Sequence, residues 1–305
     1  MAGPIGNPVS DVGELSSRAP AFAGQFYPAD VTECRRLAQS YVSAAELSEG
    51  ESVRCLGGIV PHAGWICSGA IAGQTIAAIA RSQTPDVVVV FGAIHTPLVT
   101  HLAALDVHRN WDMPGGAFEI AAELQAKLME SAGLFAVDAR FHQREHAVEV
   151  ELPLIQAAWI NAMILPVEVP VLESAIEMGR MTARRIMDAG LKAVYLASSD
   201  MTHYGPNYRF TPAGVGLPAL QWAKDNDRRL LELVTNMRIE RIVPEVRARL
   251  NACGGGAIAA MLAACREYGA TTGRVLSHAN SFETLSQIKP QTPTDAVGYA
   301  SVVIA

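Results

Sequence analysis

A chain of 305 residues, half of them apolar and 18% charged, has the composition of a folded globular protein and not of a disordered one. Its formal charge is -6 and it contains no run of Lys or Arg, so we expect neither nucleic acid nor an anionic membrane as a partner. The first residues hold no basic stretch and no apolar core, which predicts no signal peptide and a cytoplasmic location. Five scattered cysteines without CxxC spacing fit a reducing compartment.

After a Gly-, Pro- and Ser-rich start, residues 1–17, which we expect to be flexible, short β-rich runs alternate with helical patterns along residues 18–305. The predicted strands are 56–60, 86–91, 102–107, 163–167, 193–197, 274–278 and 297–304. The predicted helices are 69–81, 117–131, 149–159, 172–189, 218–236, 244–251 and 257–268. Residues 204–217, punctuated by Gly and Pro, are predicted to be a long irregular loop.

Several of these strands are almost wholly apolar, as strands covered on both faces are. No linker or change of composition divides the chain after its start. These features predict one α/β domain with a central, mostly buried mixed sheet flanked by helices.

Polar side chains follow three of the predicted apolar strands. His62 stands after strand 56–60, His95 after strand 86–91, and the run SSDMTHYG, with Asp200 and His203, after strand 193–197. Open α/β sheets bind ligands beyond the carboxyl ends of their strands. Any one of these histidines alone is more often structural, but together they point to a site in which two imidazoles converge on one metal ion.

Cys253 lies in the run NACGGG, just before the amphipathic helix predicted at 257–268. A helix N-terminus favours thiolate over thiol, which makes the sulfur a better nucleophile or metal ligand. The same run is also consistent with a flexible helix entry beside a buried thiol, or with an anion-binding nest of backbone N–H groups.

His146 and Glu149 are three residues apart in the run EHAVEVELP, where a helix would place them on one face. Such a pair can transfer protons or support metal ligands, although an exposed, charged helix start is the commoner explanation. The other histidines considered, His101, His108 and His278, have no comparable neighbours and are interpreted as structural.

Six ordered motifs together resemble the MEMO family, which includes the B component of the AmmeMemoRadiSam gene neighbourhood; they are RAPAFAGQFYP, PHAGWICSG, GAIHTP, EHAVEVELP, SSDMTHYG and CGGG. The resemblance covers residues 18–305. The family is similar to class III extradiol dioxygenases, which hold non-haem Fe(II) with two histidines and a glutamate, and it has a cysteine in place of that glutamate. The resemblance implies a metal site made by His62, His95 and Cys253, lined by His146, Asp200 and His203.

The sequence departs from the family pattern PHAGYxYSG at two positions. Trp65 and Cys67 stand where tyrosines are common, so phenol hydroxyls at the pocket are in question. Cys67 adds a second thiol that could reach the site or pair oxidatively with Cys253.

The resemblance implies a redox enzyme of the dioxygenase type that uses Fe(II), with copper or zinc as alternatives, on a small-molecule or peptide substrate. His146 or His203 would then be the general acid or base, and Asp200 would orient a histidine or water. Two alternatives stay open: a non-catalytic module that binds a peptide or phosphopeptide, and an accessory protein to a radical-SAM partner.

Overall fold

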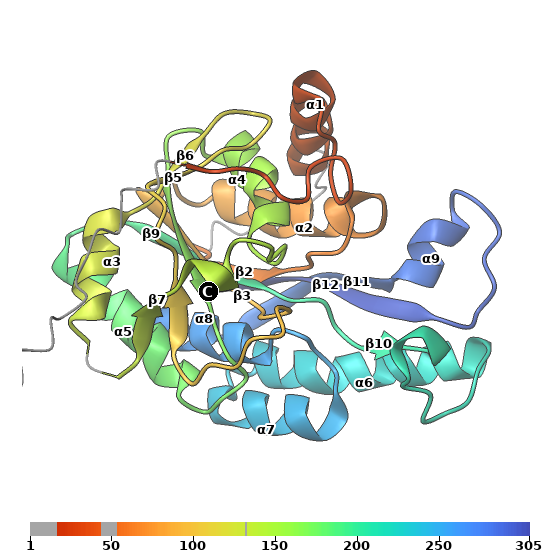
Figure 1. The fold of residues 1–305 in the computed structure, drawn as a ribbon. Helices are drawn as coiled ribbons and strands as arrows, with labels where there is room; N and C mark the ends of the chain where they lie inside the picture. Colours follow the sequence, from red (N-terminus) through yellow and green to blue (C-terminus); the bar gives the residue numbers. More distant parts are fainter. Residues whose placement is uncertain (1–16, 44–53, 132) are drawn as a thin grey trace, which may run out of the picture.

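The structure is a computed structural model that describes residues 17–43, 54–131 and 133–305, so nearly all of the segment predicted to be flexible lies outside the described residues. A mixed sheet runs through the middle of the molecule, with helices on both faces (Figure 1). The predicted α/β fold with a mixed sheet flanked by helices is therefore confirmed.

Four parallel strands form the centre of the sheet, in the order β2 (Gly57–Val60), β9 (Ala193–Ser198), β3 (Val87–Gly92) and β8 (Met163–Glu168). Antiparallel strands extend it on both sides. Beyond β2 lie β12 (Ala296–Ile304), β11 (Gly273–Asn280) and β10 (His203–Tyr204). Beyond β8 lie β4 (Ala103–Leu105) and β7 (Phe135–Val137). The carboxyl ends of the four central strands thus share one edge.

One face of the sheet is covered by α1 (Val31–Ser43), α2 (Trp65–Ala80) and α4 (Leu152–Ala158), drawn above the sheet in Figure 1. The other face packs against α3 (Ala122–Met129), α5 (Ala175–Asp188), α6 (Leu217–Thr235), α7 (Ile239–Arg249) and α8 (Gly255–Glu267). The remaining elements are short. They are α9 (Ser281–Ser286), three 3-10 turns (Ala139–Phe141, Glu149–Glu151, Pro206–Tyr208), and a small sheet of β1 (Ser17–Arg18), β5 (Asn110–Trp111) and β6 (Phe118–Glu119).

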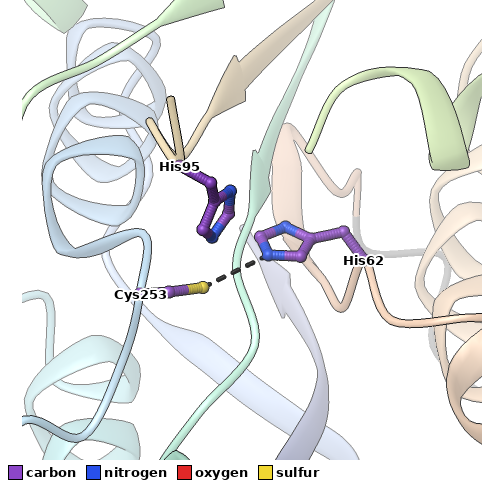
Figure 2. Close-up of side chains that lie close together, drawn as sticks. All are labelled: His62, His95 and Cys253. Carbon is purple, nitrogen blue, oxygen red and sulfur yellow. Dashed lines mark hydrogen bonds between the residues drawn. The ribbon is translucent and has the colours of Figure 1, made fainter. Parts of the chain in front are cut away.

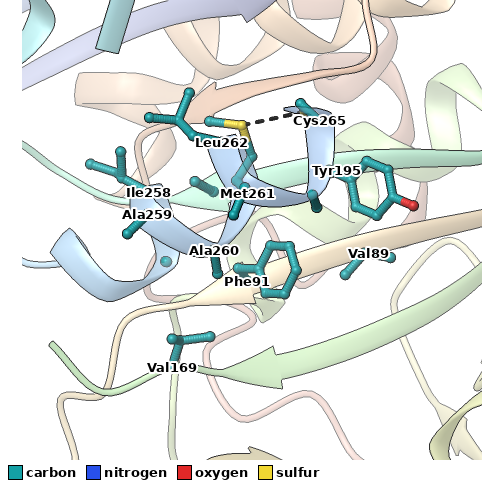
Figure 3. Close-up of a cluster of buried hydrophobic side chains, with 14 of the residues drawn as sticks. Val89, Phe91, Val169, Tyr195, Ile258, Ala259, Ala260, Met261, Leu262 and Cys265 are labelled. Atoms are coloured by element: carbon teal, nitrogen blue, oxygen red, sulfur yellow. Dashed lines mark hydrogen bonds between the residues drawn. The ribbon is translucent and has the colours of Figure 1, made fainter. Parts of the chain in front are cut away.

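The two largest hydrophobic clusters of the described residues lie on opposite sides of the sheet, because successive side chains of a strand point to opposite faces. In β3, Val89 and Phe91 contact the α8 side, whereas Val88 and Val90 contact the α2 side. Figure 3 shows the first core, where Phe91 and Val89 lie beneath the apolar residues of α8. Burial on both faces explains why β3 is a continuous run of apolar residues.

Every predicted strand is present, but several helix boundaries were wrong. Helix α2 begins at Trp65 and not at residue 69, and α3 begins at Ala122 because residues 118–119 form strand β6. Helix α7 was predicted to start at Pro244 but begins at Ile239, since Ile239 and Ile242 are buried in the core and anchor the earlier turn. Helix α1 was not predicted at all.

Candidate metal centre

Three loops that follow central strands, together with the entry to α8, meet at the carboxyl edge of the sheet. His62 follows β2, His95 follows β3, and Asp200 follows β9. Cys253 precedes α8, which begins at Gly255. One nitrogen of each histidine and the cysteine sulfur all lie within 4.8 Å of one another. Figure 2 shows the side chains of His62, His95 and Cys253 pointing toward one another.

His62 is buried, and its ring orientation is fixed by Ser198 at the end of β9. Ser198 donates its hydroxyl hydrogen to the carbonyl of Ala147, so its oxygen accepts from Nδ1 of His62 at 2.9 Å. The neutral ring then carries its lone pair on Nε2, which faces the Cys253 sulfur at 3.2 Å. Burial, and next the neighbouring His95 and His146, lower the pKa of His62 well below its usual range, so the ring stays in the form that binds metals.

His95 is held by Glu145, which lies 50 residues further along the chain. One carboxylate oxygen accepts from the His95 backbone N–H at 2.6 Å, and the other lies 2.9 Å from ring Nδ1. With Nδ1–H directed at the carboxylate, Nε2 is left for a metal. Burial lowers the pKa of His95, but hydrogen bonds to Cys253 and Glu145 outweigh it and raise the pKa to about 11. A bound cation would take the place of this proton.

Cys253 is placed by the end of β9. Its backbone N–H donates to the carbonyl of Asp200 at 3.2 Å, and the next N–H, of Gly254, donates to the hydroxyl of Ser199 at 2.9 Å. A Cβ atom at residue 254 would stand 2.7 Å from that of Ser199, so glycine is what lets the chain pass this close. The predicted position of Cys253 beside the N-terminus of α8 is correct.

These three residues fit a single metal ion. Ligands bound at about 2.0 to 2.3 Å from a common ion lie no more than about 4.5 Å apart, and the 3.2 Å between Nε2 of His62 and Sγ of Cys253 is within that limit. Two imidazole nitrogens and one sulfur suit iron, copper or zinc and not magnesium or calcium. Each histidine ring already has a partner on its other nitrogen, as metal-binding histidines usually do.

A second group, His95, Glu145 and His146, is also compact enough to hold an ion. However, the Glu145 carboxylate already accepts hydrogen bonds from the backbone N–H groups of His95, His146 and Ala147. Burial raises the pKa of Glu145, but the bonds from His146 and His95 outweigh it and hold the pKa well below its usual range. Glu145 is therefore best interpreted as a group that orients histidines.

Of the three residues predicted to line the pocket, His146 and Asp200 contact residues of the ligand group. The His146 ring lies 4.5 Å from that of His95 and 5.0 Å from that of His62, measured between centroids. Asp200 is buried, and it accepts from the backbone N–H of His62 at 2.9 Å, so it positions the main chain of His62 and not a ring. His203 packs edge-on against Tyr208 of the predicted loop 204–217, with centroids 5.0 Å apart.

The structure shows Glu149 bound to other residues than His146, and it shows no exposed helix start at Glu149. His146 precedes the 3-10 turn, and its ring lies 3.2 Å from Glu145. Glu149 is fully buried, so it is not part of an exposed helix start. It forms an ion pair with Arg18 at 2.6 Å and accepts from the backbone N–H of Phe22 at 2.7 Å. Glu149 thus ties the RAPAFAGQFYP segment to the loop that carries His146.

That segment supplies functional neighbours that the sequence analysis did not assign. The rings of Phe22 and Phe26 lie 5.5 Å and 4.9 Å from the ring of His146. Ser198 and Glu145 were not assigned a role as partners of the histidines either. For Glu145 the run EHAVEVELP offered a weak indication, because an acid directly before a histidine near other strand-end histidines is a suitable ring partner.

The two unusual residues have different roles. Trp65 is buried and donates from its indole nitrogen to the carbonyl of Val150 at 3.0 Å, so it is a packing residue. Cys67 packs in a small cluster with Tyr299. Burial raises the pKa of Cys67, which keeps it a thiol, and both Cys67 and Cys253 are free.

The fold and this site define an α/β protein that carries a two-histidine, one-cysteine group at the carboxyl edge of its central strands. The sequence profile described as Memo-like protein matches residues 18–303. The chain belongs to the Memo-like family, which confirms the resemblance seen in its motifs.

Curated relatives match over almost their whole length. A MEMO1 family protein of Methanopyrus kandleri is 31% identical, over 94% of this chain and 98% of that protein. A MEMO1 family protein of Methanosarcina barkeri is 30% identical, over 94% and 99%. Among solved structures, uncharacterized protein JW3007 from Escherichia coli K12 aligns over 94% of this chain and 98% of that chain with 11% identity and a TM-score of 0.43, which is too low to support an argument.

Proposed function

We propose that this protein binds one redox-active metal ion through His62, His95 and Cys253 and uses it in an oxidation–reduction reaction of the dioxygenase type. The observation that carries the proposal is the convergence of two Nε2 atoms and one sulfur, with both opposite ring nitrogens already engaged. Iron is the first choice and copper the second, with zinc as a redox-inactive alternative.

A three-ligand site leaves open positions, and the metal, when bound, would supply a place where oxygen and substrate can meet. The other residues act on the substrate around it. His146 is partly exposed and lies against both ligand histidines, so it is placed to exchange a proton with a bound substrate. His203 is kept neutral because burial lowers its pKa, which suits it to accept a proton.

Phe22 and Phe26 lie against His146 and are half-buried, so they limit the access of water on that side of the site. Asp200 holds the His62 backbone, and burial raises the pKa of Asp200 to about 7. The proposed reaction therefore has one proton donor or acceptor, His146, directly beside the ligand group. The substrate is proposed to be a small molecule or a peptide.

The test is metal content. Protein purified without oxygen should contain about one iron or copper ion per chain, and His62→Ala should lose it because a neutral, pre-oriented ligand is removed. His278→Ala is a control for metal content, since that histidine bonds to Asp227 and not to a proposed ligand. Wild-type protein that takes up no redox metal under these conditions would contradict the proposal.

Two other functions remain predictions: a module that binds peptides or phosphopeptides, and an accessory role beside a radical-SAM protein. Binding of a phosphopeptide that is equally tight with and without His62 would favour the first.

Among the described residues, no helix combines the length and apolar character needed to cross a membrane.

A further inference from the structure

Beside strand β3, which leads to His95, lies a buried pair of ionisable residues that the proposed function does not use. Glu168 ends strand β8, and His142 follows the 3-10 turn Ala139–Phe141. Both side chains are fully buried. The two carboxylate oxygens of Glu168 and Nδ1 of His142 have no hydrogen-bond partner among the described residues. Buried polar atoms in folded proteins almost always have a hydrogen-bond partner, so such a pair calls for an explanation.

The unpartnered atoms face each other. Nδ1 of His142 lies 3.8 Å from one oxygen of Glu168, just beyond hydrogen-bond distance. The other ring nitrogen, Nε2, lies 3.0 Å from the carbonyl of Ala104, which can only accept, so Nε2 carries the hydrogen. Nδ1 of the neutral ring is then an acceptor directed at the carboxyl group. The pair can hold one proton, on either the carboxyl or the imidazole.

The backbone makes room for this carboxyl group. Gly92, the last residue of β3, pairs with Glu168 in the parallel register. A Cβ atom at residue 92 would lie 2.3 Å from one Glu168 oxygen, so the side chain occupies the space above this glycine. Since β3 continues into His95, Glu168 lies beside the chain that carries a proposed ligand.

The charges around the pair make it sensitive to the metal centre. The groups whose fields act on Glu168 are Glu145 and Asp106, which favour its neutral form, and His95 and Arg18, which favour its charged form. Burial, and next Glu145, raise the pKa of Glu168 well above its usual range. Burial also lowers the pKa of His142, so both groups are neutral in the metal-free protein. A cation that replaces the His95 proton and carries a larger positive charge would act in a medium of low dielectric constant and favour the carboxylate.

We propose that Glu168 and His142 form a proton-exchange site that takes up one proton when the metal centre gains one electron, and releases it when that electron leaves. This inference rests on the proposed function. In the oxidised state Glu168 is a carboxylate. The electron comes from an external reductant, the proton comes from solvent, and the carboxylate becomes a carboxyl group directed at Nδ1 of His142, so the charge of the buried cluster is unchanged.

The experiment is a redox titration of the copper- or iron-loaded protein at several pH values, preceded by metal analysis. One proton taken up per electron changes the equilibrium constant tenfold per pH unit, about 59 mV for a one-electron couple. Glu168→Gln, which is neutral at every pH and of equal size, should lose this contribution. Asp200 has a pKa of about 7 and can add its own pH dependence, so the readout is the difference between wild type and variant.

Glu151→Gln is the matched control. Glu151 is also fully buried and has both oxygens without a partner among the described residues, but the charge that acts on it is Asp200 and not His95. In this control the change of reduction potential per pH unit should keep the part that Glu168→Gln loses. The inference would be overturned if the reduction potential of Glu168→Gln changed with pH as much as that of the wild type. It would also be overturned if Glu151→Gln lost as much of this pH dependence as Glu168→Gln. Either result leaves the proposed function intact.

A second measurement needs no metal. The infrared band of a protonated carboxyl group in the metal-free protein should persist at neutral pH, and Glu168→Gln should remove part of it. If wild type and Glu168→Gln showed the same band, the inference would be overturned whether or not the variant loads metal. Failure of the wild type to bind any redox metal would overturn both proposals, and metal analysis identifies that case.

Discussion

Glu145 shows how one buried carboxylate can organise a site. Its two oxygens accept from the backbone N–H groups of three residues and lie within 3.2 Å of ring nitrogens of His95 and His146. Because ring orientation decides which nitrogen faces the ligand group, we assign Glu145 the role of fixing the geometry of His95.

We therefore expect Glu145→Gln to weaken metal binding by about 10- to 100-fold, the usual cost of removing the partner of a ligand histidine. Competition with a chelator of known affinity measures the change. Glu151→Gln, which removes a buried carboxyl group without touching either histidine, should bind metal as the wild type does. Equal affinity of all three proteins would show that Glu145 does not support the ligand.

From the sequence we predicted which side chains meet at the site. The residues that hydrogen-bond to them were not predicted. His62, His95 and Asp200 were found because each follows an apolar strand, and parallel strands release their residues at one edge. Ser198 could not be paired with His62, nor Glu149 with Arg18, since those contacts span 136 and 131 residues and depend on the folded arrangement of the strands and loops.

Helices α5 and α8 cross at very close range on one face of the sheet. Gly179 of α5 lies against the backbone of α8, and a Cβ atom there would stand 2.0 Å from the carbonyl oxygen of Ala260. Helix α8 in turn follows Cys253.

Gly179→Ala should lower the free energy of unfolding by about 1–3 kcal/mol, because overpacking against backbone outweighs the ~1 kcal/mol that alanine gains in a helix. Met187→Ala, an exposed position on the same helix, should change it by less than about 0.5 kcal/mol. Urea unfolding measures both. A Gly179→Ala protein as stable as the wild type would show that the two helices can separate without cost.

The sequence predicted the strands that are buried on both faces. It missed or misplaced helices whose extent depends on tertiary contacts. The apolar run of β3 could only be a strand covered on both faces. Helix α1 was missed because it buries only Cys34 and Ala38 fully, which gives a narrow apolar stripe. The start of α7 was misplaced because a proline usually marks a first turn, whereas Pro244 lies inside this helix.

At the scale of the whole molecule, the strand order assembles the site. Strands β2, β9, β3 and β8 are neighbours in space but not in sequence, and their ends deliver His62, Asp200, His95 and Glu168 in turn. The sequence predicted a mixed sheet but could not give this order, because nearly every strand is apolar on both faces and pairing leaves no local trace.

The most direct test of the central claim is X-ray absorption at the edge of the bound metal. The arrangement of His62, His95 and Cys253 predicts one sulfur at about 2.3 Å and two nitrogens at about 2.0 Å, with the sulfur lost in Cys253→Ser and kept in Cys67→Ser. A metal surrounded only by oxygen and nitrogen in the wild type, or a sulfur that persists in Cys253→Ser, would contradict the account.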